Sequence, residues 1–201
     1  MLENKKIRLA TEDDSGFILK IYAPYINNTA ITFECIVPTI TKFRERMANI
    51  QSTYPWLVCE INNNIVGYAY ASRFREKEAY KWSVEFSVYI TPEYHRRNIG
   101  KALYFALYEL LKLQGFYNAY AGVTLPNIKS EGLHESFGFK AIGVYHNVGY
   151  KLGSWHDVKL YELKIQEHIQ LPEKPKSIND ISNTNEFKAI IEKAAQIIKI
   201  G

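Results

Sequence analysis

The stretch ITPEYHRRNIGKALYFALYELL, residues 90–111, contains a basic loop between a predicted strand and a predicted long helix. It leaves an apolar run, passes Arg96, Arg97 and Lys101 around Gly100, and continues at once into apolar residues at helical spacing. The first N–H groups of a helix have no partner within the helix, and the helix dipole adds positive charge there. Such a loop suits an anion, with a pyrophosphate as the best candidate. A basic helix start is also common as a solvated helix end, so this loop alone does not establish a site.

Two familiar phosphate loops do not fit this stretch. A P-loop needs a glycine five residues before Gly100 and a Ser or Thr after Lys101, but His95 and Ala102 stand there. The dinucleotide fingerprint GxGxxG does not occur either. The neighbouring segments therefore carry the rest of the prediction.

Length and composition indicate an ordinary globular protein. The 201 residues are 47% hydrophobic and 23% charged, which is enough for one domain with a proper core. A net charge of +4 without a basic stripe does not favour a nucleic-acid partner. No apolar run approaches the roughly 18 residues of a membrane helix, and no signal peptide is visible. We therefore expect a cytoplasmic protein with no membrane partner.

The periodicity of the chain predicts alternating strands and helices, an α/β (α+β) class. Three asparagines, Asn62–Asn64, mark a hairpin turn, and Gly115 marks the end of the long helix. Asn127 caps a short helix that Gly138 ends. The predicted strands are 5–11, two within 55–74, 79–90, 116–125 and two within 139–165; the predicted helices follow Thr11, span about 39–51, run from the loop to about 114, and lie within 126–138.

The composition changes after Leu171, so we predict a main domain over residues 1–170 and an appendage over 171–201. Residues 172–185 read as an exposed linker. An apolar helical stripe from Phe187 to Ile198 then follows an Asn183/Glu186 capping pattern. This tail helix either docks on its own domain or contacts a second subunit or another partner.

Several separated stretches resemble one family. They are IRLATEDD, IYAPYINNTAITFE, YPWLVCE, VGYAYASRFREKEAYKWSVEFSVYI, LPNIKS, LHESFGF and GYKLGSWHDV, in order along residues 6–165. The chain resembles the GNAT superfamily of N-acetyltransferases, and within it the phosphinothricin and methionine-sulfoximine acetyltransferase branch. The resemblance implies a central mixed, mostly antiparallel twisted sheet flanked by helices. It also implies acetyl-CoA as co-substrate, with its pyrophosphate on the loop.

The loop departs from the family pattern Gln/Arg-x-x-Gly-x-Gly/Ala. With Gly100 as the last glycine, His95 replaces the leading residue and Asn98 the first glycine. A second register, from Arg97 through Gly100 to Ala102, fits the letters fully; the first keeps the apolar helix positions in step. Asparagine tolerates the left-handed backbone conformation, so the turn can survive.

Acetyl transfer needs a base for the ammonium, polarisation of the thioester carbonyl and stabilisation of the thiolate. Glu85, on the polar face of an otherwise apolar strand, is the predicted base, and the resemblance places the family's base there too. His134 is the candidate acid, although a lone helical histidine is more often a packing residue. The resemblance implies that the strand splays after Glu85 and that the cofactor contacts are Val88, Tyr89, Ile90, Arg96, Arg97, Asn98, Ile99, Gly100, Lys101, Asn127 and Ser130.

For the acceptor, the branch uses small amino-acid-like compounds. Arg73 and Arg75 offer a clamp for a carboxylate, and Thr32, Phe33, Glu34 and Tyr80 complete the predicted pocket. The resemblance implies a homodimer, with the stretch GSWHDV able to contribute from the partner. The alternative interpretation of His156 and Asp157 is a satisfied hairpin pair.

The predicted function is therefore acetyl-CoA-dependent acetylation of the α-amine of a small amino-acid-like acceptor by direct transfer. The alternatives are a protein or peptide N-terminal acetyltransferase and a non-catalytic acyl-CoA-binding module; the presence of Glu85 argues against the latter. His146 and His168 have no companion at metal-ligand spacing, and HExxH, CxxC and GxSxG do not occur. We therefore predict no metal.

Overall fold

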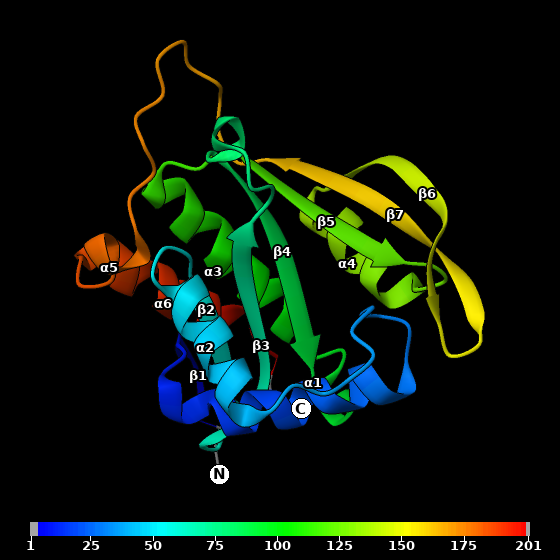
Figure 1. Cartoon of the computed structure of the whole chain (residues 1–201). Coiled ribbons are helices and arrows are strands. Elements are labelled where there is room, and N and C mark those ends of the chain that lie inside the picture. The colour runs from blue at the N-terminus through cyan, green and yellow to red at the C-terminus, as the bar shows by residue number, and fades with distance from the viewer. Residues whose placement is uncertain (1–3, 200–201) are drawn as a thin grey trace.

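The computed structural model describes residues 4–199 and shows one seven-stranded sheet between two layers of helices (Figure 1). The strand order is β1-β2-β3-β4-β5-β7-β6, and every neighbouring pair is antiparallel except β4 and β5. The strands are β1 (Lys5–Leu9), β2 (Trp56–Ile61), β3 (Asn64–Arg73), β4 (Ser83–Ile90), β5 (Asn118–Thr124), β6 (Lys140–Lys151) and β7 (Ser154–Lys164). The predicted fold class, a mixed and mostly antiparallel sheet flanked by helices, is confirmed.

The α-helices are α1 (Ser15–Asn28), α2 (Ile40–Gln51), α3 (Ile99–Gln114), α4 (Ile128–Phe137), α5 (Ile178–Ile181) and α6 (Asn185–Ile197). Short 3-10 turns are η1 (Glu12–Asp14), η2 (Glu78–Tyr80) and η3 (Pro92–Tyr94). Asn62 and Asn63 both have positive φ, 50° and 64°, so the predicted asparagine turn joins β2 to β3. Within residues 4–199, no helix combines the length and apolar composition of a membrane span.

The two faces of the sheet bury separate cores because side chains alternate along each strand. On β4, Val84 and Phe86 face the core formed with α3. Tyr89 faces the other side and packs with Tyr22 of α1 and Tyr68 of β3. The side chains of Glu85 and Ser87 share the face of Tyr89 by the same alternation.

Helix α3 is the apolar centre of the domain. Its first turn begins directly after Asn98, and Gly115 ends it in the left-handed conformation at φ 92°, as predicted for this glycine. Leu103, Leu107 and Leu110 are fully buried. This burial fixes the start of α3, and with it the preceding loop, against the sheet.

The prediction of an exposed linker over residues 172–185 was wrong in part. Ile178 and Ile181 are buried in the main core as the apolar side of α5. The Gln114 side chain donates to the Lys176 carbonyl at 2.8 Å, and the Lys176 N–H donates to the Gln114 carbonyl at 2.8 Å. The turn-rich composition of residues 172–185 did not predict these buried side chains and hydrogen bonds, because they depend on the end of α3, which is distant in the sequence.

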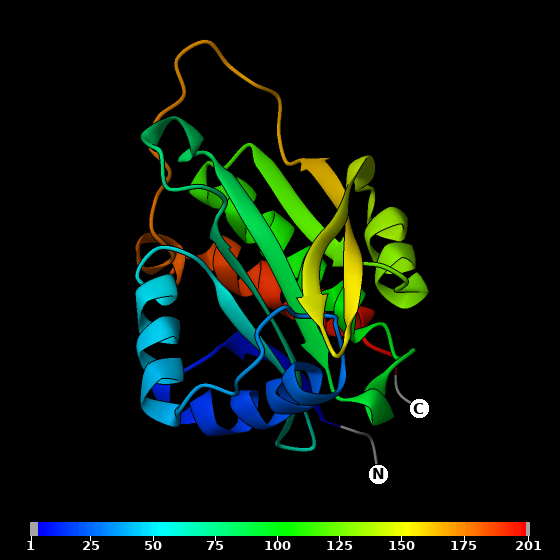
Figure 2. The same ribbon diagram turned by 45° about the vertical axis from the view of Figure 1, so that its right-hand side comes forward.

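Helix α6 packs on its own chain, against α3 and β1 (Figure 2). Its apolar stripe joins the core on the face opposite α1 and α2, with Ala194 fully buried. The cap is Thr184, whose hydroxyl accepts from the Phe187 N–H at 3.2 Å, and not the predicted Asn183.

Candidate active site

A split between β4 and β5 defines the candidate site. These parallel strands pair only from Ser83–Glu85 to Asn118–Tyr120 and then diverge (Figures 1 and 2). The Thr91 N–H donates to Val66 on the β3 side, and backbone groups alternate along a strand. The backbone N–H and C=O of Val88 therefore point into the gap. The splay expected after Glu85 is present.

A cleft lies at this split, and its lining includes side chains from both faces of the sheet, such as Phe86 and Tyr89. Residues of β4, β5, α3 and α4 and of the segment after α1 meet there, so the cleft depends on five separate parts of the chain. Its lining is Ile31, Phe86, Ser87, Val88, Tyr89, Tyr104, Gly122, Val123, Thr124, Asn127, Ser130 and His134. Five of the predicted residues, Val88, Tyr89, Asn127, Ser130 and His134, lie on it.

Glu85 stands on β4 where the pairing with β5 ends. Its outer side is open to solvent, while a Cβ built on Gly122 of β5 would lie 4.0 Å from its Oε1. Loss of water next to β5 raises the pKa of Glu85, and the positive charge of Arg75 opposes this rise. The site therefore has an accessible carboxylate with a raised pKa, as a general base requires.

His134 lies inside the cleft at 3% exposure, and both of its ring nitrogens have hydrogen-bond partners. Nδ1 lies 2.7 Å from the Ser130 carbonyl, which can only accept, so Nδ1 carries the proton. Nε2 lies 3.0 Å from the Tyr104 hydroxyl and accepts from it. Burial lowers the pKa of His134, which keeps the ring neutral. This arrangement favours His134 as a link between α4 and α3 and gives it no free proton for the predicted acid role.

The loop between β4 and α3 holds two non-glycine residues in the left-handed region. Arg96 has φ 68° and Asn98 has φ 60°. The asparagine therefore adopts the conformation that a glycine would favour, as we expected. The N–H groups of the first turn of α3 have no carbonyl partner inside the helix. The guanidinium of Arg97 lies 5.1 Å over the ring of Tyr94, while Arg96 and Lys101 are exposed.

Close packing explains Gly100 in this first turn. A Cβ there would lie 3.1 Å from Leu133 of α4 and 3.3 Å from Ile90 of β4. Glycine thus lets α3 begin against both elements. The Ile90 carbonyl accepts from the Tyr25 hydroxyl at 2.6 Å and lies 2.9 Å from His95 Nε2, which uses both of its lone pairs. Of the predicted contacts on β4, Ile90 therefore has the carbonyl with least capacity for a ligand.

Asn127 caps α4 as predicted. Its Oδ1 accepts from the Ser130 N–H at 3.2 Å, and both residues face the cleft. A cap uses only part of the hydrogen-bonding capacity of an amide, so the Asn127 NH₂ group remains a candidate contact for a ligand.

The predicted acceptor residues Thr32 and Glu34 belong to a polar network over the same face of the sheet as Glu85. The Tyr22 hydroxyl lies 2.8 Å from Thr32 Oγ1 and 3.2 Å from Glu34 Oε1. Arg46 of α2 donates to Glu34 at 2.5 Å. Lys151 of β6 is buried and donates to the Thr32 carbonyl at 2.7 Å. No local signal in the sequence pointed to Arg46 or Lys151, because each reaches the network from a distant element.

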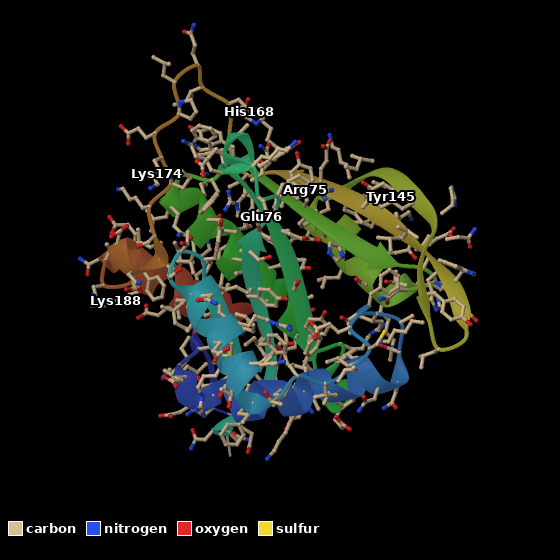
Figure 3. All side chains as sticks on the ribbon, in the orientation of Figure 1. Arg75, Glu76, Tyr145, His168, Lys174 and Lys188 are labelled. Carbon is tan, nitrogen blue, oxygen red and sulfur yellow. The ribbon has the colours of Figure 1, made fainter. Side chains whose placement is uncertain are left out.

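The structure does not bring Arg73 and Arg75 together as a clamp. Arg73 continues the α3 face of β3, and its guanidinium donates to the backbone carbonyls of Arg75 and Glu76. The positive charge of Arg75 instead opposes the rise that burial causes in the pKa of Glu85. Its guanidinium lies 5.0 Å from the centre of the Phe74 ring, at the end of the sheet where β4 and β5 begin (Figure 3). Phe74 also contacts the predicted pocket residue Tyr80, with ring centroids 5.8 Å apart. Of the pair, only Arg75 therefore acts on the pKa of the proposed base.

The hairpin of β6 and β7 reaches the acceptor network from its own chain. A Cβ on Gly149 would lie 2.3 Å from the ring of Phe33, so glycine allows this ring to lie on the hairpin backbone. His156 Nε2 lies 3.0 Å from the Lys151 carbonyl. Asp157 accepts from the Asn147 N–H at 2.7 Å, so His156 and Asp157 are each satisfied within the hairpin but not by one another.

Among residues 4–199, no group of three or more His, Cys, Asp or Glu side chains is arranged to hold a metal ion.

Comparison with known proteins assigns the class of this fold and site. Residues 7–160 match the family model described as an acetyltransferase (GNAT) domain. The chain therefore belongs to the GNAT acetyltransferase family, and the predicted family and enzyme class are confirmed. It is an acyltransferase by that membership.

Two relatives and one solved structure illustrate which members of the family the chain is similar to. The chain is 33% identical to a phosphinothricin N-acetyltransferase of Streptomyces viridochromogenes over 177 residues, 88% of this chain and 94% of that protein. It is 31% identical to an L-methionine sulfoximine/L-methionine sulfone acetyltransferase of Salmonella typhimurium, over 81% of this chain and 95% of that protein. A phosphinothricin acetyltransferase of Sinorhizobium meliloti, solved in complex with acetyl-CoA, has a TM-score of 0.81 at 30% identity and covers 86% of this chain and 95% of its own.

Proposed function

We propose that this protein transfers the acetyl group of acetyl-CoA directly to the α-amine of a small amino-acid-like acceptor of the phosphinothricin or methionine sulfoximine type, with Glu85 as general base. The observation that carries the proposal is the position of Glu85 at the start of the β4/β5 split. There its pKa is raised, it is open to solvent, and it lies next to Gly122, which lines the cleft. The names of the relatives support the acceptor class.

The residues of the gap are proposed to contact the elongated arm of acetyl-CoA. The backbone of Val88 supplies an N–H that faces the gap and is proposed to polarise the thioester carbonyl. Asn127 and Ser130 supply polar groups on the opposite wall. The loop 96–101 and the first turn of α3 are proposed to hold the pyrophosphate, since N–H groups and cationic side chains gather there.

The proposed reaction conserves protons. Glu85 takes one proton from the acceptor ammonium, and the free amine attacks the thioester carbon. The C–S bond then breaks as the amide forms. A second proton leaves the nitrogen and is transferred to the departing thiolate, directly or through water. Arg75, beside Glu85, is the proposed partner of the acceptor carboxylate.

Thiol release from acetyl-CoA tests this proposal. Wild type and Glu85→Gln are compared on phosphinothricin, methionine sulfone, methionine sulfoximine, common amino acids and a set of peptides. Turnover on the small compounds that falls at least tenfold in the variant supports the proposal. Turnover on peptides alone would instead favour an N-terminal acetyltransferase, and acetyl-CoA binding without turnover would favour a non-catalytic module.

The family resemblance implied a homodimer, and we propose that it forms through the β6–β7 hairpin. Large apolar side chains are exposed on this hairpin, with Tyr150 at 59% and Trp155 at 62%, and Tyr145 lies on its outer surface (Figure 3). A mass of twice 23.3 kDa by light scattering is expected, and Trp155→Asp should reduce it toward the monomer. A wild-type monomer at micromolar concentration would contradict the dimer. The cytoplasmic location stays a prediction.

A further inference from the structure

The segment over residues 178–199 is built into the core of the described structure. Helices α5 and α6 cover the face of the sheet that α3 occupies. Ile198, directly after α6, is 2% exposed. The family model ends at residue 160, so this segment lies outside the part of the chain that defines the family.

The end of this segment contacts the loop between β4 and α3. The Lys199 N–H donates to the Arg97 carbonyl at 2.9 Å. The Asn98 side chain lies 3.5 Å from the Ile197 carbonyl, which is the long limit of a hydrogen bond. The Lys5 ammonium donates to the Ile198 carbonyl at 2.6 Å and ties the same point to β1. Three successive residues thus connect the segment to the loop and to the sheet.

The loop needs such support because of its backbone conformation. Arg96 and Asn98 flank Arg97 and both have positive φ, which is uncommon for residues other than glycine. Conformations of this kind persist where surrounding contacts fix them. The side chain of Asn98 also reaches Ile197, in the segment that lies outside the family model. Asn98 and the end of this segment therefore meet at one contact.

We propose that residues 197–199 position the loop for the pyrophosphate of acetyl-CoA, and that the Lys199 N–H is the main positioning group. The inference rests on the proposed function of the loop. The bond fixes the direction of the Arg97 carbonyl and, through the peptide backbone, the direction of the neighbouring N–H groups. The segment then controls affinity for the donor, with no part in proton transfer or in binding of the acceptor.

A matched pair of substitutions separates the N–H group from the side chain. Lys199→Pro removes the N–H, whereas Lys199→Ala keeps it and removes only an exposed side chain. Ile198 has φ −66° and ψ 127°, a conformation that suits a residue before proline. The dissociation constant for CoA is measured by calorimetry, and the kinetic constants by thiol release.

We expect about fivefold weaker CoA binding and a matching rise in KM for acetyl-CoA in Lys199→Pro, which is the usual scale for one net hydrogen bond. Lys199→Ala should stay within about twofold of wild type, and kcat and KM for the acceptor should be unchanged in both variants. Equal CoA affinity in the two variants overturns the inference, even where Lys199→Pro lowers the melting temperature. A wild type that does not bind CoA at all overturns the proposed function of the loop itself.

Discussion

Replacing Glu85 by glutamine changes the proposed base with little change of shape. Even a Cβ added at Gly122 would lie 4.0 Å from the carboxylate oxygen, so an amide of the same size fits beside this glycine. The amide cannot accept the ammonium proton. General base catalysis typically contributes 10²–10⁴, so we expect kcat/KM to fall about 100-fold at pH 7, or about 2.7 kcal/mol.

The pH dependence distinguishes loss of a base from loss of packing. The wild-type rate should fall as pH decreases through the folded pKa of Glu85, which burial raises above its ordinary value. The pH profile of the variant lacks this acidic limb. The variant can use only acceptor molecules whose amine has already lost its proton in solution. Below the pKa of the amine, the fraction of such molecules rises tenfold per pH unit. The ratio of wild type to variant should therefore shrink with increasing pH.

Stability supplies the control for the same substitution. A carboxyl group whose pKa is raised by folding binds its proton more tightly in the folded state, so its ionised form costs folding free energy at neutral pH. Glu85→Gln should then unfold no earlier than wild type at pH 7. Glu45→Gln, at an exposed acid of α2, should change neither rate nor stability. A ratio that stays constant between pH 6 and 9 would refute Glu85 as the base.

Two further predictions concern stability. A Cβ on Gly132 in the middle of α4 would meet no atom within 4 Å. Gly132→Ala should therefore stabilise the protein by roughly 0.5–1 kcal/mol and raise the melting temperature by roughly 1–4 °C. A lower melting temperature would contradict this and show that the helix needs glycine at this position. Burial opposes ionisation of Asp14, but hydrogen bonds from Arg8 at 2.6 Å and from the Thr11 N–H at 2.7 Å hold its pKa below the ordinary value. Asp14→Asn should therefore cost about 1–3 kcal/mol at pH 7 in urea unfolding. The wild-type advantage should disappear as pH falls through that lowered pKa, and an equal difference at pH 7 and pH 2 would contradict this cause.

Local sequence determined the elements of this fold because their signals lie within a few residues. The asparagine turn before β3 and the cap at Asn127 follow from backbone preferences and short side-chain hydrogen bonds. Because side chains alternate along β4, the sequence placed Glu85 on the face of the sheet opposite to that of Val84 and Phe86. The strand that carries the proposed base was therefore predictable without the tertiary structure.

The same local information overestimated two sites. Arg73 and Arg75 both follow the apolar part of β3. Arg73 is the last residue of the strand and keeps the α3 face of Ala69 and Ala71, whereas the chain leaves the strand before Arg75, whose charge then acts on Glu85. His134 has the sequence position of an acid, yet Tyr104 and Ser130 occupy both of its ring nitrogens. In each case the role depends on neighbours from another element, which spacing along the chain does not specify.

The sequence by itself determined the family, the strand of Glu85 and the loop before α3. Only the tertiary structure decided which groups face the cleft, since the split of β4 from β5 depends on how far two distant strands stay paired. It also joined Arg46 and Lys151 to the acceptor network and the end of the chain to the Arg97 carbonyl. The contacts of Lys151 and Lys199 join residues that are more than 100 positions apart in the chain. They stabilise the fold only after the core has brought those segments together.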